Sequence, residues 1–318
     1  MDEERELTEQ EVEQKIISFL KKLTNHKHID ITSRGNTAIK AAFSLVPIIS
    51  EGKESKKIKE ILVPEEGGWL TYKDLPQRMG ISFAEVKCDD AKISLQDLQQ
   101  KLQTKKYALF LYQNPGGYFA QQPMKEIYAL CRRFACLVVV DVSGSIGTKL
   151  CDGNYADLFV GSFGKWKLVE AHAGGFISCR DEQLFDLMIT QGKIEKLNDE
   201  LNDELNDELN DELNDRSKLK IILEKLNGLG ERIQFLLEKR KKIIADLLGL
   251  NIVPPIVSQE ALVHKNSLGF VVVIKFVTGQ EKEKIINYCK ENNLEWTECP
   301  RYIRLNKKAI SIEVKRLN

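Results

Sequence analysis

Two residues with reactive side chains stand at the ends of successive apolar segments of this 318-residue chain. Asp141 ends the apolar run Leu137–Val140, and Lys167 follows the segment Asp157–Ser162 after a Ser/Gly turn. A carboxylate binds cationic groups, and a lysine amine can act as a nucleophile. Taken alone, Asp141 is explained as a turn residue and Lys167 as a solvated lysine. Their places at neighbouring strand ends favour a shared site.

The elements that must position these residues alternate along the chain. The run Leu137–Val140 lacks polar alternation, which predicts a strand covered on both faces. Strands that alternate with helices predict an α/β fold with a three-layer, doubly wound, mostly parallel sheet, in which ligands collect at the carboxyl ends of the strands. We expect strands at Lys59–Pro64, Ile81–Lys87, Tyr107–Gln113, Leu137–Ser143, Asp157–Ser162 and Gly174–Cys179, and helices at Thr37–Ile49, Ser94–Leu102, Met124–Phe134 and from Asp181 onward.

The chain divides into four predicted parts: an N-terminal helical arm (1–30), a large domain (31–190), a helical connection (191–250) and a small C-terminal α/β domain (251–318). The connection contains a Leu-Asn-Asp-Glu repeat between Leu197 and Asp215, followed by an amphipathic helix at Ser217–Leu248. We interpret the repeat as an expanded, exposed helical tract, because a straight helix does not converge oxygen ligands on a cation. The small domain offers a strand at Gly269–Phe276, a helix at Glu281–Asn292 and a strand at Ile310–Leu317.

Bulk composition excludes several classes of function. Lysine plus arginine equals aspartate plus glutamate at 47 residues each, a balance that argues against a nucleic-acid partner. No apolar run approaches the roughly 18 residues that span a bilayer, and the acidic N-terminus is unlike a signal peptide. The histidines His26, His28 and His264 lack a surrounding pattern of metal ligands, so no metal is expected. These features predict a soluble, cytoplasmic protein without a membrane partner.

Five motifs occur in an order that resembles fold-type-I enzymes dependent on pyridoxal 5′-phosphate, the aspartate aminotransferase superfamily. The resemblance is closest to the DegT/DnrJ-type aminotransferases and covers roughly Ile31 to Cys179. The motifs are the helix opening Gly35-Asn36-Thr37, Trp69 after a strand, Asn114 in an Asn-Pro-Gly-Gly turn, Asp141 at a strand end, and Ser162 with Lys167 before Gly174-Gly175.

The resemblance implies a role for each residue. Lys167 would form the Schiff base and move the substrate's α-proton, with its pKa lowered by desolvation and by the cationic ring. Asp141 would keep the ring nitrogen protonated, so that the ring can accept electrons. The remaining cofactor-binding residues are Gly35, Asn36, Thr37 and Ser162 for the phosphate, Trp69 for the ring face, and Asn114, with Gln113 in reserve, for the phenolic oxygen.

Several alternatives stay open at this point. Lys165 competes with Lys167 as the cofactor lysine, and His172 is a candidate proton shuttle. Arg301 and Arg304 are candidates for binding a substrate carboxylate. The resemblance implies a homodimer acting on a small-molecule amino donor and acceptor, either amino acids or amino/keto sugars. A lyase, a desulfurase and an inactive binding or regulatory protein are the other readings.

Overall fold

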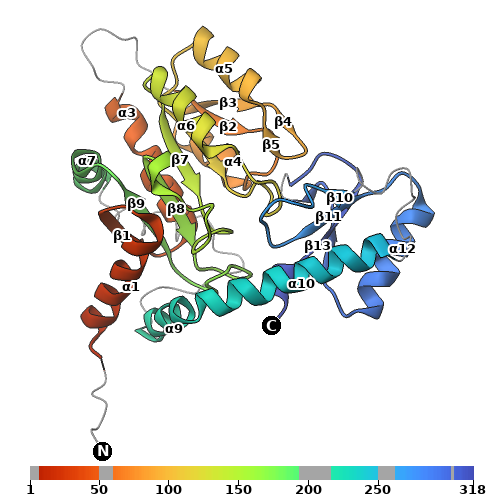
Figure 1. Cartoon of the computed structure of the whole chain (residues 1–318). Coiled ribbons are helices and arrows are strands. Elements are labelled where there is room, and N and C mark those ends of the chain that lie inside the picture. The colour runs from red at the N-terminus through yellow and green to blue at the C-terminus, as the bar shows by residue number, and fades with distance from the viewer. Residues whose placement is uncertain (1–6, 50–59, 193–215, 250–261, 302–303) are drawn as a thin grey trace, which may run out of the picture.

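The computed structural model describes residues 7–49, 60–192, 216–249, 262–301 and 304–318 (Figure 1). The Leu-Asn-Asp-Glu tract, Leu197 to Asp215, for which an exposed helix is predicted, lies outside the described residues. Within the described part of the chain, no helix combines the length and apolar character needed to cross a membrane.

The helices follow the amphipathic stretches, and several begin at a residue that caps them. Thr8 and Thr278 each form a capping box, and the Ser94 hydroxyl accepts the Asp97 N–H. The single helix expected over Ser217–Leu248 is two helices, separated at Gly228, a residue of low helix propensity. The helices are α1 (Glu9–Thr24), α2 (Gly35–Phe43), α3 (Leu45–Ile49), α4 (Thr71–Arg78), α5 (Leu95–Thr104), α6 (Met124–Arg133), α7 (Glu182–Gly192), α9 (Arg216–Asn227), α10 (Leu229–Gly249) and α12 (Gly279–Glu291).

A seven-stranded sheet forms the large domain, in the order β1-β9-β8-β7-β6-β2-β3. Strands β8, β7, β6, β2 and β3 run parallel, and β9 is antiparallel to both of its neighbours. The expectation of a mostly parallel sheet is confirmed. The strands are β1 (His28–Thr32), β2 (Glu60–Pro64), β3 (Ser82–Val86), β6 (Leu109–Gln113), β7 (Leu137–Asp141), β8 (Leu158–Ser162) and β9 (Gly175–Cys179).

Both faces of this sheet are covered, which accounts for the continuous apolar strands. Along β6, Phe110 and Tyr112 belong to one buried cluster, whereas Leu109 and Leu111 belong to another. The first cluster includes residues of α1, α5, α6, α9 and α10, and the second includes residues of α2, α4 and α7. Alternation along each strand therefore supplies two cores, one on each face, and the three layers follow.

The small domain is built on a four-stranded antiparallel sheet in the order β10-β11-β13-β12. Helix α10 runs from beside α9 to this domain and contacts β11 (Figure 1). The expected final strand Ile310–Leu317 ends earlier, at Ile312, and a 3₁₀ turn at Val314–Arg316 follows it. The small-domain strands are β10 (Leu262–Val263), β11 (Val272–Lys275), β12 (Trp296–Glu298) and β13 (Ala309–Ile312); a two-stranded hairpin, β4 (Cys88–Asp89) with β5 (Lys92–Ile93), and a 3₁₀ turn at Gly153–Tyr155 belong to the large domain.

Candidate active site

Asp141 is the last residue of β7, and its carboxylate is held by two hydrogen bonds. The Ser143 N–H donates to Oδ1 at 2.8 Å, and the Tyr72 hydroxyl donates to Oδ2 at 2.6 Å. Tyr72 is fully buried in α4, and burial together with the nearby Asp141 charge raises the pKa of its hydroxyl. Tyr72 therefore stays protonated and acts as a fixed hydrogen-bond donor to the Asp141 carboxylate.

Lys167 lies close to two aromatic side chains. Its Nζ is 2.5 Å from the Tyr118 hydroxyl, 5.2 Å from the Tyr118 ring centroid and 5.7 Å from the Trp69 ring centroid. The sequence placed Trp69 and Lys167 in one site, and the structure brings them together. Tyr118 was not among the residues chosen from the sequence.

The direction of the Lys167 pKa shift differs from the expectation. Burial lowers the pKa of Lys167, but the Tyr118 hydroxyl and the Asp141 carboxylate outweigh burial, and the net shift is upward. The expectation counted desolvation and a cationic ring and left out these two oxygen groups. In the protein itself, the Lys167 amine therefore holds its proton more tightly than a free lysine does.

The start of α2 meets the end of β8. A Cβ added at Gly35 would lie 2.6 Å from the Ser162 Cβ, so only glycine permits this approach of helix and strand. The N-cap residue, Arg34, makes no side-chain hydrogen bond to the helix. Thr37 contributes a hydroxyl, paired with Ser33 at 3.0 Å. Backbone N–H groups at the positive end of a helix, with hydroxyls beside them, suit an anion such as phosphate.

The amides of Asn114 and Gln113 are used differently. Asn114 is fully buried, its Nδ2 donates to the Leu150 carbonyl at 3.2 Å, and its Oδ1 accepts the Gln122 N–H at 3.0 Å. Gln113 lies beside Asp141 in the register of β6 and β7, and its buried Nε2 has no hydrogen-bond partner. This geometry favours Gln113 over Asn114 as the donor to a bound group, because an unpaired buried N–H is costly.

The small domain contributes cations to the same region. The Arg304 guanidinium is 5.8 Å from the Tyr118 ring centroid, and Lys315 Nζ is 4.8 Å from it. Arg304 is ion-paired with the buried Glu313, and Glu313 Oε2 lies 3.4 Å from Lys315 Nζ. Arg301 is exposed. Of the two arginines chosen from the sequence, the structure brings Arg304 to Tyr118, and it adds Lys315.

The competing residues point elsewhere. Lys165 is exposed, and its Nζ lies 4.6 Å from the Trp166 ring centroid. The His172 side chain is 53% exposed, and its Nε2 is 3.4 Å from Glu170. Both arrangements favour Lys167 as the reactive amine.

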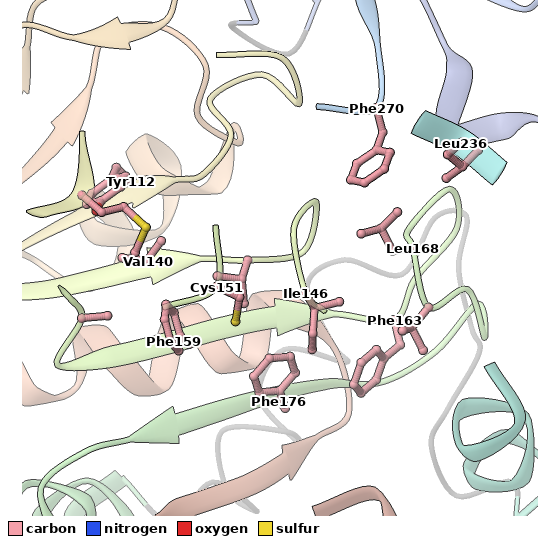
Figure 2. Packing of buried hydrophobic residues seen from close by; sticks show 14 of the residues in the cluster. Tyr112, Val140, Ile146, Cys151, Phe159, Phe163, Leu168, Phe176, Leu236 and Phe270 are labelled. Carbon is pink, nitrogen blue, oxygen red and sulfur yellow. The ribbon is translucent and has the colours of Figure 1, made fainter. Parts of the chain in front are cut away.

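Packing of the next residue, Leu168, fixes the loop that carries Lys167. Leu168 is buried and lies between Phe270 and Leu236 on one side and Phe163 on the other (Figure 2). Phe270 belongs to the small domain and Leu236 to α10, so the hydrophobic core continues from the large sheet across the domain boundary. The Lys167 loop is thus clamped by both domains.

These residues fit pyridoxal 5′-phosphate by their chemistry. The start of α2 offers N–H groups and hydroxyls for a phosphate, Trp69 offers a ring face, and Asp141 offers a carboxylate. Gln113 has an unsatisfied donor, and Lys167 provides an amine. Sequence reasoning missed Tyr72, Tyr118, Glu313 and Lys315. Only Tyr118 gave a signal that could have been used, because it directly follows the Asn-Pro-Gly-Gly turn at the end of β6.

Solved structures with the same fold include several aminotransferases. The chain is similar to ureidoglycine-glyoxylate aminotransferase from Bacillus subtilis, with 16% identity and a TM-score of 0.64 over 95% of this chain and 78% of that one. It is also similar to PseC of Helicobacter pylori, an aminotransferase involved in the biosynthesis of pseudoaminic acid, with 12% identity and a TM-score of 0.66 over 96% and 87%. The chain is also similar to 3-amino-5-hydroxybenzoic acid synthase, with 14% identity and a TM-score of 0.62 over 95% of this chain and 85% of that one.

These likenesses confirm the expected fold class. No curated protein matches the chain by sequence. One family profile, described as the DegT/DnrJ/EryC1/StrS aminotransferase family, matches residues 8–298. Because that match spans most of the chain, the protein belongs to the DegT/DnrJ/EryC1/StrS aminotransferase family.

Proposed function

We propose that this protein is an aminotransferase dependent on pyridoxal 5′-phosphate, with Lys167 as the residue that carries the cofactor. The observation that carries the proposal is the position of the Lys167 amine at the carboxyl edge of the parallel strands. The amine lies beside Trp69 and Tyr118 and interacts electrostatically with the Asp141 carboxylate. Membership of the aminotransferase family supports the same reaction class. The cofactor, when bound, supplies an aldehyde and an electron-accepting ring.

The side chains of this protein have separate tasks in that reaction. Asp141, whose carboxylate accepts hydrogen bonds from Tyr72 and the Ser143 N–H, would hold a protonated ring nitrogen. Trp69 would fix the plane of the ring. Lys167 would take the α-proton of the amino substrate on Nζ and return it at another carbon, which is general base and acid catalysis by one amine.

The remaining contacts orient the cofactor. The start of α2, with Gly35, Asn36 and Thr37, and the hydroxyl of Ser162 would bind the phosphate. The unpaired Nε2 of Gln113 supports Gln113 rather than Asn114 as the donor to the ring oxygen.

Replacement of Lys167 tests the proposal directly. The purified chain should develop a visible absorption band with pyridoxal phosphate, and borohydride reduction should leave the added mass on Lys167. We expect Lys167→Ala to abolish both signals, since the amine is the attachment point. The matched control Lys165→Ala, two positions away on the exposed side of the loop, should retain both. Absence of a band in the unmodified chain contradicts the cofactor assignment, and loss of the band in Lys165→Ala moves the assignment to Lys165.

Half-reactions identify the reaction type. With a panel of amino acids and amino sugars, an aminotransferase converts the bound cofactor to its amine form and releases a keto product. Release of the substrate's side chain or sulfur would instead identify a lyase or a desulfurase, and no conversion with any donor would indicate a binding or regulatory protein. Light scattering at several concentrations checks the homodimer implied by the resemblance, and cell fractionation checks the cytoplasmic location.

A further inference from the structure

Tyr118 is held in an unusual backbone conformation. Its φ is +69°, a left-handed value that is uncommon for a bulky residue and costs free energy. Its N–H donates to the Pro115 carbonyl at 3.1 Å, and its own carbonyl accepts the Phe270 N–H at 2.9 Å. The turn after β6 and Phe270, which precedes β11, therefore hold this residue from both domains.

Two glycines approach Tyr118 closely, one at its ring and one at its carbonyl. A Cβ added at Gly144 would lie 2.5 Å from the Tyr118 Cδ1, and a Cβ at Gly269 would clash with the Tyr118 carbonyl. Two glycines, one in each domain, thus permit the position of this tyrosine. Strained positions that the surroundings enforce in this way gather at functional sites.

The strained backbone brings the Tyr118 hydroxyl to Lys167 Nζ at 2.5 Å. Cations from the small domain lie against the same ring, Lys315 at 4.8 Å and Arg304 at 5.8 Å from its centroid. The other charged groups around this pair are Asp141, near Lys167, and Glu313, which pairs with Arg304 and Lys315. Within the described residues, Lys167 is the hydrogen-bond partner of the hydroxyl.

We propose that Tyr118 is a positioning residue that acts through Lys167: its hydroxyl accepts the Nζ–H hydrogen bond, sets the proton affinity of the amine and orients it for proton transfer. The proton-transfer role rests on the proposed function, whereas the hydrogen bond between Lys167 and Tyr118 does not. In the proton-transfer step, the substrate C–H bond breaks, an N–H bond forms on Lys167, and the electron pair stays with the substrate. The Tyr118 oxygen accepts a hydrogen bond from the ammonium ion that results, and the reverse step returns the proton.

A purely structural tyrosine would behave differently when its hydroxyl is removed. The backbone hydrogen bonds of residue 118 and the packing of its ring are kept by phenylalanine, so a structural role predicts that Tyr118→Phe leaves the Lys167 amine unchanged. A positioning role predicts that in Tyr118→Phe the Lys167 amine loses an acceptor and releases its proton more easily.

Competitive acylation of lysines measures this difference in the full chain, after any bound aldehyde is removed with hydroxylamine. Mass spectrometry follows acylation of Lys167 and of Lys165, an exposed reference amine in the same loop, as a function of pH. In the unmodified chain, the midpoint for Lys167 should lie above that for Lys165. In Tyr118→Phe the Lys167 midpoint should fall by about one pH unit, and Tyr155→Phe, a control on the 3₁₀ turn before β8, should leave it in place.

Equal midpoints for Lys167 and Lys165 in the unmodified chain overturn the inference, even if Tyr118→Phe does not fold. An unchanged Lys167 midpoint in a folded Tyr118→Phe variant, checked by circular dichroism, overturns it as well. With an amino donor found, the acid limb of kcat should move to lower pH by about one unit in Tyr118→Phe, with KM changed less than about twofold. Because acylation needs no cofactor, it tests this inference separately from the proposed function, which is tested by the visible band and the half-reactions.

Discussion

Two clusters where the small domain meets the large one place a carboxylate among cations, and they differ in burial. Glu313 is fully buried, and its partners Arg304, Lys315 and Arg316 are less than 10% exposed. Asp90, in the turn between β4 and β5, is 16% exposed, and its partner Lys307 is 49% exposed. The first cluster faces Tyr118 and the second ties the domains together at their rim.

Burial gives the two clusters different electrostatics. Burial works to raise the pKa of Glu313, but Arg304 and Lys315 prevail and lower the pKa from 4.5 to about 2. Burial, with Arg304 and Lys167 nearby, lowers the pKa of Lys315 from 10.5 to about 7. At Asp90, burial raises the pKa while hydrogen bonds from Lys275 and Lys307 lower it, and the net shift is downward.

The comparison indicates two uses of one charge pattern. A buried carboxylate among three cations is costly to disturb, because each charge that loses its partner stays out of water. Such a cluster can hold Arg304 and Lys315 in fixed positions beside Tyr118. A partly exposed pair is screened and exchanges its contacts for water at little cost, which suits a clasp between domains.

Neutralising Glu313 should have the largest effect. Glu313→Gln keeps the shape of the side chain but leaves Arg304 and Lys315 buried with a neutral neighbour, so we expect a loss of about 3–5 kcal/mol in the free energy of unfolding. Denaturant unfolding monitored by circular dichroism measures it. The control Glu298→Gln removes an exposed carboxylate paired with Lys282 and should cost less than about 1 kcal/mol. Equal losses in the two variants would remove burial as the explanation.

The pH dependence of stability tests Lys315. The folded chain releases the Lys315 proton near pH 7, whereas the unfolded chain keeps it up to about 10.5, so the unfolded state binds more protons in between. Stability should therefore rise as the pH increases through this window, by about 2 kcal/mol from pH 7 to 9 for this one group. Lys315→Met should lose this gain, because it has no amine to titrate.

The exposed lysine Lys308 provides the control for that measurement, since Lys308→Met should retain the rise. If Lys315→Met and the unmodified chain gain the same stability between pH 7 and 9, the Lys315 amine is not held in a buried position among cations. The difference between the two curves isolates Lys315 from the other groups that titrate in this range.

The sequence predicted the large sheet well for a physical reason. Strands covered on both faces must be continuously apolar, and such apolar runs mark β6, β7 and β8 in the sequence. Strand β1 was missed because its residues, His28 to Thr32, alternate with polar groups at the sheet edge, and the predicted arm absorbed them. Helix α4 was missed because its sequence is polar and contains Pro76. The short strands β4, β5, β10 and β12 are too brief to show a period.

The geometry of the candidate site was predictable only where it depends on strand ends. Asp141, Ser162 and Lys167 follow parallel strands, whose carboxyl ends share one edge, so their proximity could be inferred from order alone. Tyr118 depends on a left-handed backbone and on two glycines from different domains, and Lys315 depends on a 3₁₀ turn that ends the expected last strand early. Such contacts arise from the tertiary fold and leave little trace in local sequence.

The smallest effect is expected at Asp90, and it sharpens the comparison through salt. Asp90→Asn keeps a side chain that tolerates the left-handed φ of +49° and removes the charge that pairs with Lys275 and Lys307. We expect a loss of less than about 1 kcal/mol at low ionic strength, shrinking toward zero as salt screens the exposed pairs. The loss in Glu313→Gln should persist at the same salt concentrations, because water and ions do not reach the buried cluster. Unfolding curves of both variants across a salt series make the distinction. A salt-independent loss in Asp90→Asn would mean that the Asp90 ion pairs are shielded from solvent when the domains pack. The two clusters would then differ only in how much they stabilise the fold.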